Sequence, residues 1–120
     1  MAKYNILQEK SFSFAVRIVN LYKHLQNEKK EFVLSKQVLR SGTSIGANVE
    51  ESVGGQSDKD FLSKLSISYK EARETIYWIK LLFATDYITE EQKISIINDA
   101  DELCKILAKI ILTTKQKSNL

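Results

Sequence analysis

The chain contains no proline, only four glycines and a single cysteine in 120 residues. Because proline interrupts helices, its absence favours long unbroken ones. Cys104 alone cannot form an intrachain disulfide, and one cysteine together with one histidine, His24, supplies too few ligands for a structural zinc site. The composition therefore excludes folds held by disulfides or zinc, and it predicts a domain held by core packing in a reducing, cytoplasmic setting.

Long apolar segments are missing as well. The N-terminal sequence MAKYNILQEK lacks the apolar core of a signal peptide, and no uninterrupted apolar run approaches the roughly 20 residues of a membrane span. The length suits one domain, which buries about two thirds of the surface that its unfolded chain exposes. We expect a single cytoplasmic domain over residues 1–120, without a membrane partner.

The net charge is modest, +3, from 18 basic and 15 acidic residues. The whole surplus lies in residues 1–31, where the basic residues outnumber the acidic ones. These basic residues are the candidate nucleic-acid contacts: Lys3, Lys10, Arg17, Lys23, Lys29 and Lys30. Three of them recur with His24 at seven-residue spacing along one flank of an expected helix. Two interpretations of this flank are open, a solvated edge and an RNA-binding edge.

Apolar residues recur at helical spacing in four segments, so we predict helices at residues 4–28, 36–53, 58–86 and 90–114. The third segment has the most regular core-facing row, in which spacings of three and four residues alternate. The connections between the segments are short, and no strand pattern occurs. The sequence therefore predicts an all-α fold, an antiparallel up-down-up-down four-helix bundle.

Polar residues and glycines mark the expected ends of these helices. Ser35 is the expected N-cap of the second helix, and Gly54-Gly55 is expected to end it with a left-handed residue. Capping boxes that start at Ser57 and Thr89 are expected to open the third and fourth helices. The C-terminal residues QKSNL are expected to fray.

Two of the helices carry more apolar surface than a single bundle would use. On the third, three large side chains lie almost opposite the core-facing row: Ile67, Trp78 and Leu81. On the fourth, four residues widen the apolar arc beyond a narrow stripe: Ile96, Leu103, Ile106 and Ile110. Because a second apolar face calls for a partner surface, the sequence predicts a homo-oligomer.

The second helix, with QVLRSGTSIGANVEES at residues 37–52, has a composition that suits close helix contact. Gly42 and Gly46 each cost roughly 1 kcal/mol relative to alanine inside a helix, so packing must make use of the missing side chains. A polar stripe adjoins the core-facing residues of this helix: Gln37, Arg40, Ser44, Asn48 and Glu51.

Most of this stripe, with three residues of the third helix, forms a candidate structural network or interface: Arg40, Ser44, Asn48, Glu51, Glu71, Glu74 and Trp78. Arg40 and Asn48 are expected to bond carboxylates of this set, the alternative being an RNA-phosphate contact by Arg40. Trp78 is expected to pack at an interface, with base stacking as the alternative. A metal centre is disfavoured because the Glu-x-x-His motif of bundle di-metal sites is missing. With no nucleophile–base pair and no cofactor loop, we expect neither catalysis nor a cofactor.

From Tyr4 to Ile111 the chain resembles the bacterial four-helix bundle proteins encoded in intervening sequences of 23S ribosomal RNA genes. The resemblance rests on SGTSIGANVEE at residues 41–51 and on SDKDFLSKLSISYKEARETIYWIKLL at residues 57–82. Gly46 stands where the usual pattern, Ser-Ile-Pro-x-Asn-Ile-Ala-Glu-Gly, has proline. The chain is therefore similar to the subgroup that bears SGTSIGANVEE and KEARET-YW.

This resemblance implies four-helix bundles that assemble as homopentameric rings and have no established catalytic activity. It also implies likeness to the accessory protein of diversity-generating retroelements, whose basic pentamer binds nucleic acid and a reverse transcriptase. The leading hypothesis is thus a ring that pools basic surface to bind structured RNA or an RNA-associated protein. The rival hypothesis is a protein–protein interaction scaffold with no nucleic-acid role, which a nuclease-resistant pull-down would favour.

Overall fold

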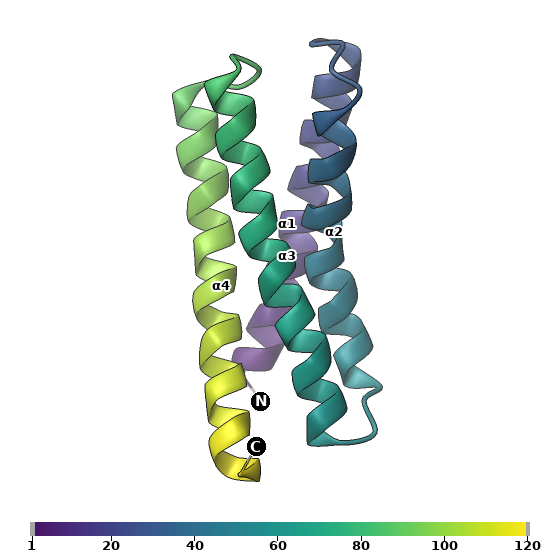
Figure 1. The fold of residues 1–120 in the computed structure, drawn as a ribbon, viewed down its shortest axis with the longest axis vertical. Helices are drawn as coiled ribbons and strands as arrows, with labels where there is room; N and C mark the ends of the chain where they lie inside the picture. The colour runs from purple at the N-terminus through teal and green to yellow at the C-terminus, as the bar shows by residue number, and fades with distance from the viewer. Residues whose placement is uncertain (1, 120) are drawn as a thin grey trace.

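A computed structural model describes the backbone of residues 2–119 and the side chains of residues 4–119. Over that range the chain forms α1 (Ala2–Asn27), α2 (Leu34–Val53), α3 (Asp58–Ala84) and α4 (Glu90–Ser118), without a strand. Successive helices run in opposite directions and form a bundle about 48 Å long and 22 by 21 Å across (Figure 1). The predicted four-helix bundle is confirmed. None of these described helices combines the length and apolar character needed to cross a membrane.

The two ends of the bundle differ in what they carry. The α1–α2 and α3–α4 connections lie at one end, whereas the α2–α3 connection and the chain termini lie at the other (Figure 1). Each helix packs beside two others, and the α1–α4 contact is the sparsest of the four. The bundle is therefore two tight hairpins, α1–α2 and α3–α4, joined closely through α2 and α3 and loosely through α1 and α4.

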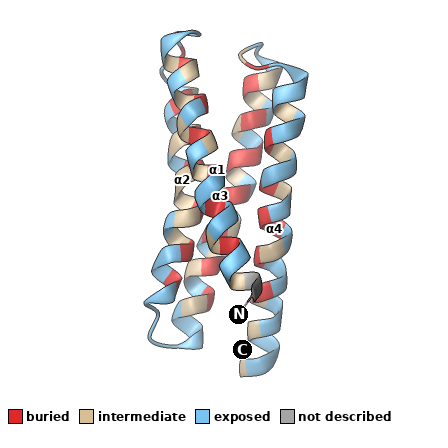
Figure 2. Ribbon diagram, turned by 180° about the vertical axis from the view of Figure 1, so that it is seen from behind, coloured by how far each residue is buried: buried red, intermediate tan, exposed pale blue. Residues whose placement is uncertain are grey.

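Buried residues, coloured red on the ribbon of Figure 2, line the inner sides of all four helices, and most of them are apolar. The predicted core-facing rows supply most of them, including Ile18 on α1 and Leu65 and Ile79 on α3, each fully buried. These side chains repeat at three- and four-residue spacing, so each helix turns one stripe toward the centre. Burying them removes apolar surface from water, which is the main favourable term in folding.

The second apolar face predicted for the fourth helix is wrong. Three of its residues, Ile96, Leu103 and Ile110, are buried within the single chain, and Ile106 is partly buried. Because α4 lies between α3 and α1, a broad arc of its surface is covered inside one bundle. On α3, Trp78 and Leu81 are likewise only partly exposed.

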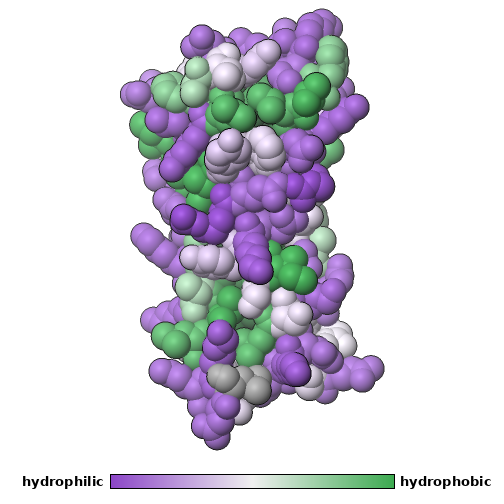
Figure 3. Space-filling model, in the orientation of Figure 1, coloured by the Kyte–Doolittle hydropathy of each residue, from purple (hydrophilic) through white to green (hydrophobic). Residues whose placement is uncertain are grey.

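The exposed apolar side chains lie elsewhere. Two are neighbours one turn apart on α1, Phe12 at 71% exposure and Val16 at 47%. The other large ones are spread over the bundle: Ile6, Phe32, Val33, Val53, Ile67, Tyr77, Ile94 and Leu112. Figure 3 shows one face, on which apolar patches near both ends flank a hydrophilic belt.

The glycines of α2 allow α1 to approach closely, as their positions predicted. A Cβ added at Gly42 would lie 2.7 Å from Cγ1 of Ile18, and one at Gly46 would lie 3.3 Å from the backbone oxygen of Ser11. At Gly42 the added Cβ would clash with the buried side chain of Ile18, and at Gly46 it would crowd the backbone of Ser11. The cost of glycine in this helix is therefore offset by the helix contact that it permits.

The start of α2 differs from the prediction. The helix begins at Leu34, and its N-cap residue, Val33, makes no side-chain capping bond, so Ser35 is not the N-cap. The capping acceptor is the carboxylate of Glu31, which accepts the backbone N–H of Val33 at 3.2 Å and of Ser35 at 2.6 Å. Ser35 instead donates its hydroxyl to the Glu31 backbone oxygen at 2.8 Å. Capping from this distance along the chain has no simple sequence signature.

The remaining helix ends are a mixture of confirmed and wrong predictions. The capping box predicted at Thr89 is confirmed. At Ser57 half of the predicted box is present: the Ser57 hydroxyl accepts the backbone N–H of Asp60 at 3.1 Å, without a return bond from the Asp60 side chain among the described residues. The left-handed ending of α2 is wrong, since Gly54 has a φ of −85°. The frayed tail is wrong as far as Ser118, where α4 ends, and Leu120 lies outside the described residues.

Candidate interaction surfaces

The contact between α2 and α3 is built on short hydroxyl side chains. Ser68 donates to the backbone oxygen of Ile45 at 2.8 Å, and the hydroxyls of Thr75 and Ser41 hydrogen-bond each other at 2.9 Å. All three hydroxyl residues are fully buried. Small side chains let the helices approach, and because each hydroxyl has a partner, their burial leaves no unsatisfied polar group.

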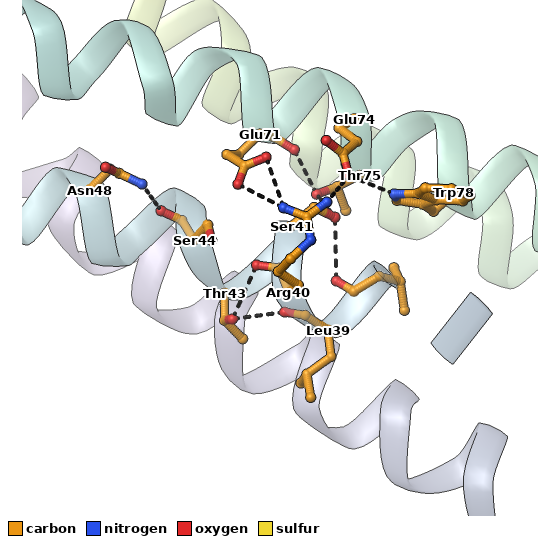
Figure 4. A network of polar contacts seen from close by, with 11 residues as sticks. Leu39, Arg40, Ser41, Thr43, Ser44, Asn48, Glu71, Glu74, Thr75 and Trp78 are labelled. Atoms are coloured by element: carbon orange, nitrogen blue, oxygen red, sulfur yellow. Dashed lines mark hydrogen bonds and ion pairs between the residues drawn. The ribbon is translucent and has the colours of Figure 1, made fainter. Parts of the chain in front are cut away.

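A charged network lies over this contact, at the surface (Figure 4). Arg40 on α2 reaches across to two acids of α3, donating to the Glu71 carboxylate at 3.2 Å and pairing with Glu74. Glu74 also accepts the indole N–H of Trp78 at 2.9 Å. The structure therefore brings together four of the predicted network residues from two helices.

The exposure of this network limits its energy. The Arg40 side chain is 50% exposed, whereas those of Glu71 and Glu74 are 17% and 35% exposed. Half-exposed ion pairs contribute about 1 kcal/mol or less, because water competes for the same charges.

Trp78 is held against Tyr77 in an edge-on arrangement with ring centroids 5.2 Å apart. The arrangement fixes an aromatic pair beside a guanidinium and supplies no nucleophile.

The other predicted network residues lie apart from this cluster. Asn48 donates to the backbone oxygen of Ser44 at 2.8 Å and bonds no carboxylate, so that part of the prediction is wrong. Short polar side chains in a helix often bond the carbonyl one turn earlier, and the Asn48 amide does so here. Glu51 pairs with Lys64 at 2.8 Å. An interface role for these residues stays a prediction.

The basic flank of α1 faces acids of α4. Lys10 pairs with Glu102 at 3.1 Å, and Arg17 pairs with Asp99 at 2.8 Å while also donating to Ser95 at 2.8 Å. Beside these pairs is a small cavity of about 220 Å³. The charges of Lys10 and Arg17 are therefore compensated within the chain. The side chain of Lys3 lies outside the described residues.

A different group of lysines carries uncompensated charge. Lys23, Lys29 and Lys30 are exposed at the end of the α1–α2 hairpin, residues 23–36, which we call the α1–α2 tip. Lys36, in the first turn of α2, is exposed beside them. None of the four pairs with an acid among the described residues. Sequence analysis missed Lys36 because it lies outside the basic N-terminal third.

Of the two acidic residues in this tip, Glu28 is exposed and Glu31 is turned inward. Glu31 is 8% exposed and its carboxylate is engaged by the start of α2. Burial tends to raise the pKa of this carboxyl, but the hydrogen bonds from the backbone of Ser35, Leu34 and Val33 outweigh it and lower the pKa below the ordinary value of 4.5. Glu31 thus stays ionised as a capping group.

A cavity of about 1070 Å³ opens at the opposite end of the bundle, where Tyr4, Val53, Phe61 and Lys117 are among the residues that line it. Tyr4 donates its hydroxyl to the backbone oxygen of Val49 at 2.8 Å, and burial raises its pKa. The wall is mainly apolar, and its charged residues include Asp58 and Lys117. Among the described residues no cluster of histidine, cysteine and acidic side chains could hold a metal ion.

Cys104 is buried in the core of the bundle. Burial raises the pKa of its thiol and outweighs the opposing effect of the Arg73 charge. The thiol is therefore held protonated among apolar side chains, a position that suits packing and not nucleophilic chemistry.

Comparison with known proteins places these surfaces in context. The family described as 23S rRNA-intervening sequence protein matches residues 3–109. A crystal structure of a protein with unknown function from the S23 ribosomal protein family of Bacteroides thetaiotaomicron is similar, with a TM-score of 0.90 and 60% sequence identity. The similarity covers 91% of this chain and 97% of that one. Comparison with curated proteins gives no significant match.

Proposed function

The chain belongs to the 23S rRNA-intervening sequence protein family, and we propose that it is a non-enzymatic homo-oligomer that binds structured RNA or an RNA-containing complex. Several copies, five by the resemblance, would form a ring in the cytoplasm and pool their basic surface. The observation that carries the proposal is the α1–α2 tip, where Lys23, Lys29 and Lys30 are exposed without an ion pair among the described residues. Free ammonium groups attract phosphate, whereas paired ones have already lost most of that capacity.

This proposal narrows the set of basic residues expected to contact RNA. Lys10 and Arg17 are engaged by acids of α4, so their release would cost the ion pairs that join α1 to α4. The three tip lysines need no such exchange. Repetition then multiplies a modest charge, since five copies of a +3 chain carry about +15 in total.

Exposed apolar side chains support assembly. Phe12 and Val16 lie together on α1, and Ile67 and Tyr77 are exposed on α3. Phe12 and Val16 are one turn apart, and a second copy packed against α1 would remove their apolar surface from water. The network of Arg40, which links α2 and α3 at the surface, would set the register of a subunit contact.

The experiment measures RNA binding and assembly on one preparation. Fluorescence anisotropy with a labelled RNA hairpin measures the association constant. Its logarithm is expected to fall linearly with the logarithm of the salt concentration. The triple variant Lys23→Gln, Lys29→Gln, Lys30→Gln is expected to bind about tenfold more weakly and with a smaller salt slope. Analytical ultracentrifugation of the unliganded protein is expected to give five chain masses.

A matched control separates position from net charge. The triple variant Lys105→Gln, Lys109→Gln, Lys115→Gln removes the same charge from α4 and is expected to bind nearly as well as wild type. Equal weakening by both triple variants would assign the binding to net charge alone. Absence of salt-sensitive binding would remove the RNA role, and RNA-independent capture of a protein through Phe12 and Val16 would favour the rival scaffold function.

A further inference from the structure

We propose that the α1–α2 tip binds unpaired RNA, with Phe32 as a stacking platform for a base and the flanking lysines as phosphate contacts. The inference rests on the proposed RNA-binding function and names the part of the RNA that this surface would select. Phe32 is 50% exposed and stands between Lys30 and Lys36 in the sequence of the tip. An exposed aromatic ring among unpaired cations is the combination that single-stranded nucleic acids recognise.

The tip presents Phe32 outward because its neighbour is fixed inward. The backbone N–H of Glu31 donates to the Leu25 oxygen at 2.9 Å, and its carboxylate caps α2. Lys30, with a φ of +54°, makes the left-handed turn that precedes this anchor. With Glu31 held inside the hairpin, the next two residues, Phe32 and Val33, are exposed at 50% and 70%.

The anchoring matters for binding. A ring on a mobile loop would lose conformational freedom when a base stacks on it, which weakens association. Here the backbone on both sides of Phe32 is hydrogen-bonded, so little ordering remains for the ligand to impose. Glu31 is buried and committed to the cap, which leaves Glu28 as the exposed carboxylate of residues 23–36.

The chemistry selects unpaired RNA over a duplex. In an A-form duplex the faces of the bases are stacked on one another, so a protein ring can reach them only at loops, bulges and ends. The lysines attract phosphates of either form, whereas Phe32 adds binding energy only where a base is free. The preference for unpaired RNA should therefore depend on the ring and the overall affinity on the lysines.

The adjacent tip of the bundle restricts where RNA can lie. The α3–α4 connection is at the same end (Figure 1), where Asp86 in the connection and Glu90 and Glu91 in the first turn of α4 are exposed. These carboxylates repel a polyanion. The RNA is accordingly directed to the α1–α2 side of this end.

The test compares two exposed apolar side chains on two RNAs. Phe32→Ala is expected to weaken binding of a 12-nucleotide oligouridylate about tenfold, the loss of one stacked base, and to leave binding of a duplex of equal length within twofold. Leu112→Ala, which removes a side chain that is 58% exposed on α4, is expected to leave both affinities within twofold. Phe32→Trp is expected to restore oligouridylate binding.

Four results would overturn the inference. Wild-type affinity of Phe32→Ala for oligouridylate would remove the ring from the contact, as would an equal loss on both RNAs. A change of oligomer mass in Phe32→Ala with unchanged RNA binding would make the tip a contact between copies. If the wild type bound neither RNA, the proposed function would fail with it, whereas binding that is indifferent to Phe32 would leave that function standing.

Discussion

The two long sides of α1 are packed in different ways. Toward α2, the missing side chains of Gly42 and Gly46 let the backbones approach until a single added methyl would touch Ile18 or the Ser11 carbonyl. Toward α4, long side chains bridge a wider gap, as Lys10 and Arg17 reach acids beside a cavity of about 220 Å³. One side depends on close packing of small groups, and the other depends on half-exposed charge.

The difference shows where the fold is specified. Close contacts of glycine and buried hydroxyls admit few alternative arrangements, so they fix how α1, α2 and α3 lie together. Ion pairs between long, flexible side chains allow many arrangements of the helices that they join, and salt screens them. The α1–α4 side is therefore the one along which the bundle is expected to open first.

The largest effect should come from filling the close contact. Gly42→Val would drive its side chain into Ile18, and overpacking of this kind is expected to destabilise the protein by about 2–3 kcal/mol. Gly54→Val makes the same change where the nearest heavy atom to an added Cβ is 3.8 Å away, and a change within about 0.5 kcal/mol is expected there. Urea denaturation of both variants measures the difference. Equal losses would erase the contrast between the two sides of α1.

A smaller effect is expected at the carboxylate that starts α2. Glu31→Gln weakens a charge-assisted cap and should cost about 1–2 kcal/mol at pH 7. Because the folded-state pKa of Glu31 lies below 4.5, its contribution is fully present above that pH and is lost as the pH falls through the folded pKa. The stabilities of wild type and variant should therefore converge in acid.

The exposed neighbour Glu28 supplies the control for this carboxylate. Glu28→Gln is expected to change stability by less than about 0.5 kcal/mol at either pH. Denaturation at pH 7 and pH 3 distinguishes the cases. A gap between wild type and Glu31→Gln that persisted at pH 3 would mean that the side chain acts through packing, without its charge.

Sequence alone predicted the fold well, because the fold depends on periodicity. Apolar spacing located all four helices, and glycine at positions 42 and 46 indicated a close contact before its partner was known. The prediction that α4 has a second apolar face for a partner was wrong. A helical projection gives the width of an apolar arc but not the number of neighbouring helices that cover it. Two flanking helices bury Ile96 and Ile110 inside one chain.

The candidate surfaces could be predicted only in part, since charge pairing depends on three-dimensional neighbours. A seven-residue spacing placed Lys10 and Arg17 on one flank correctly, but nothing in the sequence shows that Asp99 and Glu102, over 80 residues later, face them. The inward turn of Glu31 was equally hidden. A segment that the sequence indicates only as a polar connection therefore contains a buried carboxylate that caps α2.

The smallest effect on stability is expected at the ion pairs that join α1 to α4. Glu102→Gln removes the partner of Lys10, yet both side chains are about half exposed, so a loss of no more than about 0.5 kcal/mol is expected at low salt. In 1 M salt the loss should vanish, because screening has already removed the attraction. Glu91→Gln, an exposed acid without an ion pair among the described residues, controls for net charge.

A loss of stability above about 2 kcal/mol in Glu102→Gln that salt did not reduce would exceed what an exposed ion pair can contribute. It would mean that the α1–α4 side is as closely specified as the α1–α2 side, and that Lys10 is fixed there and unable to turn toward RNA.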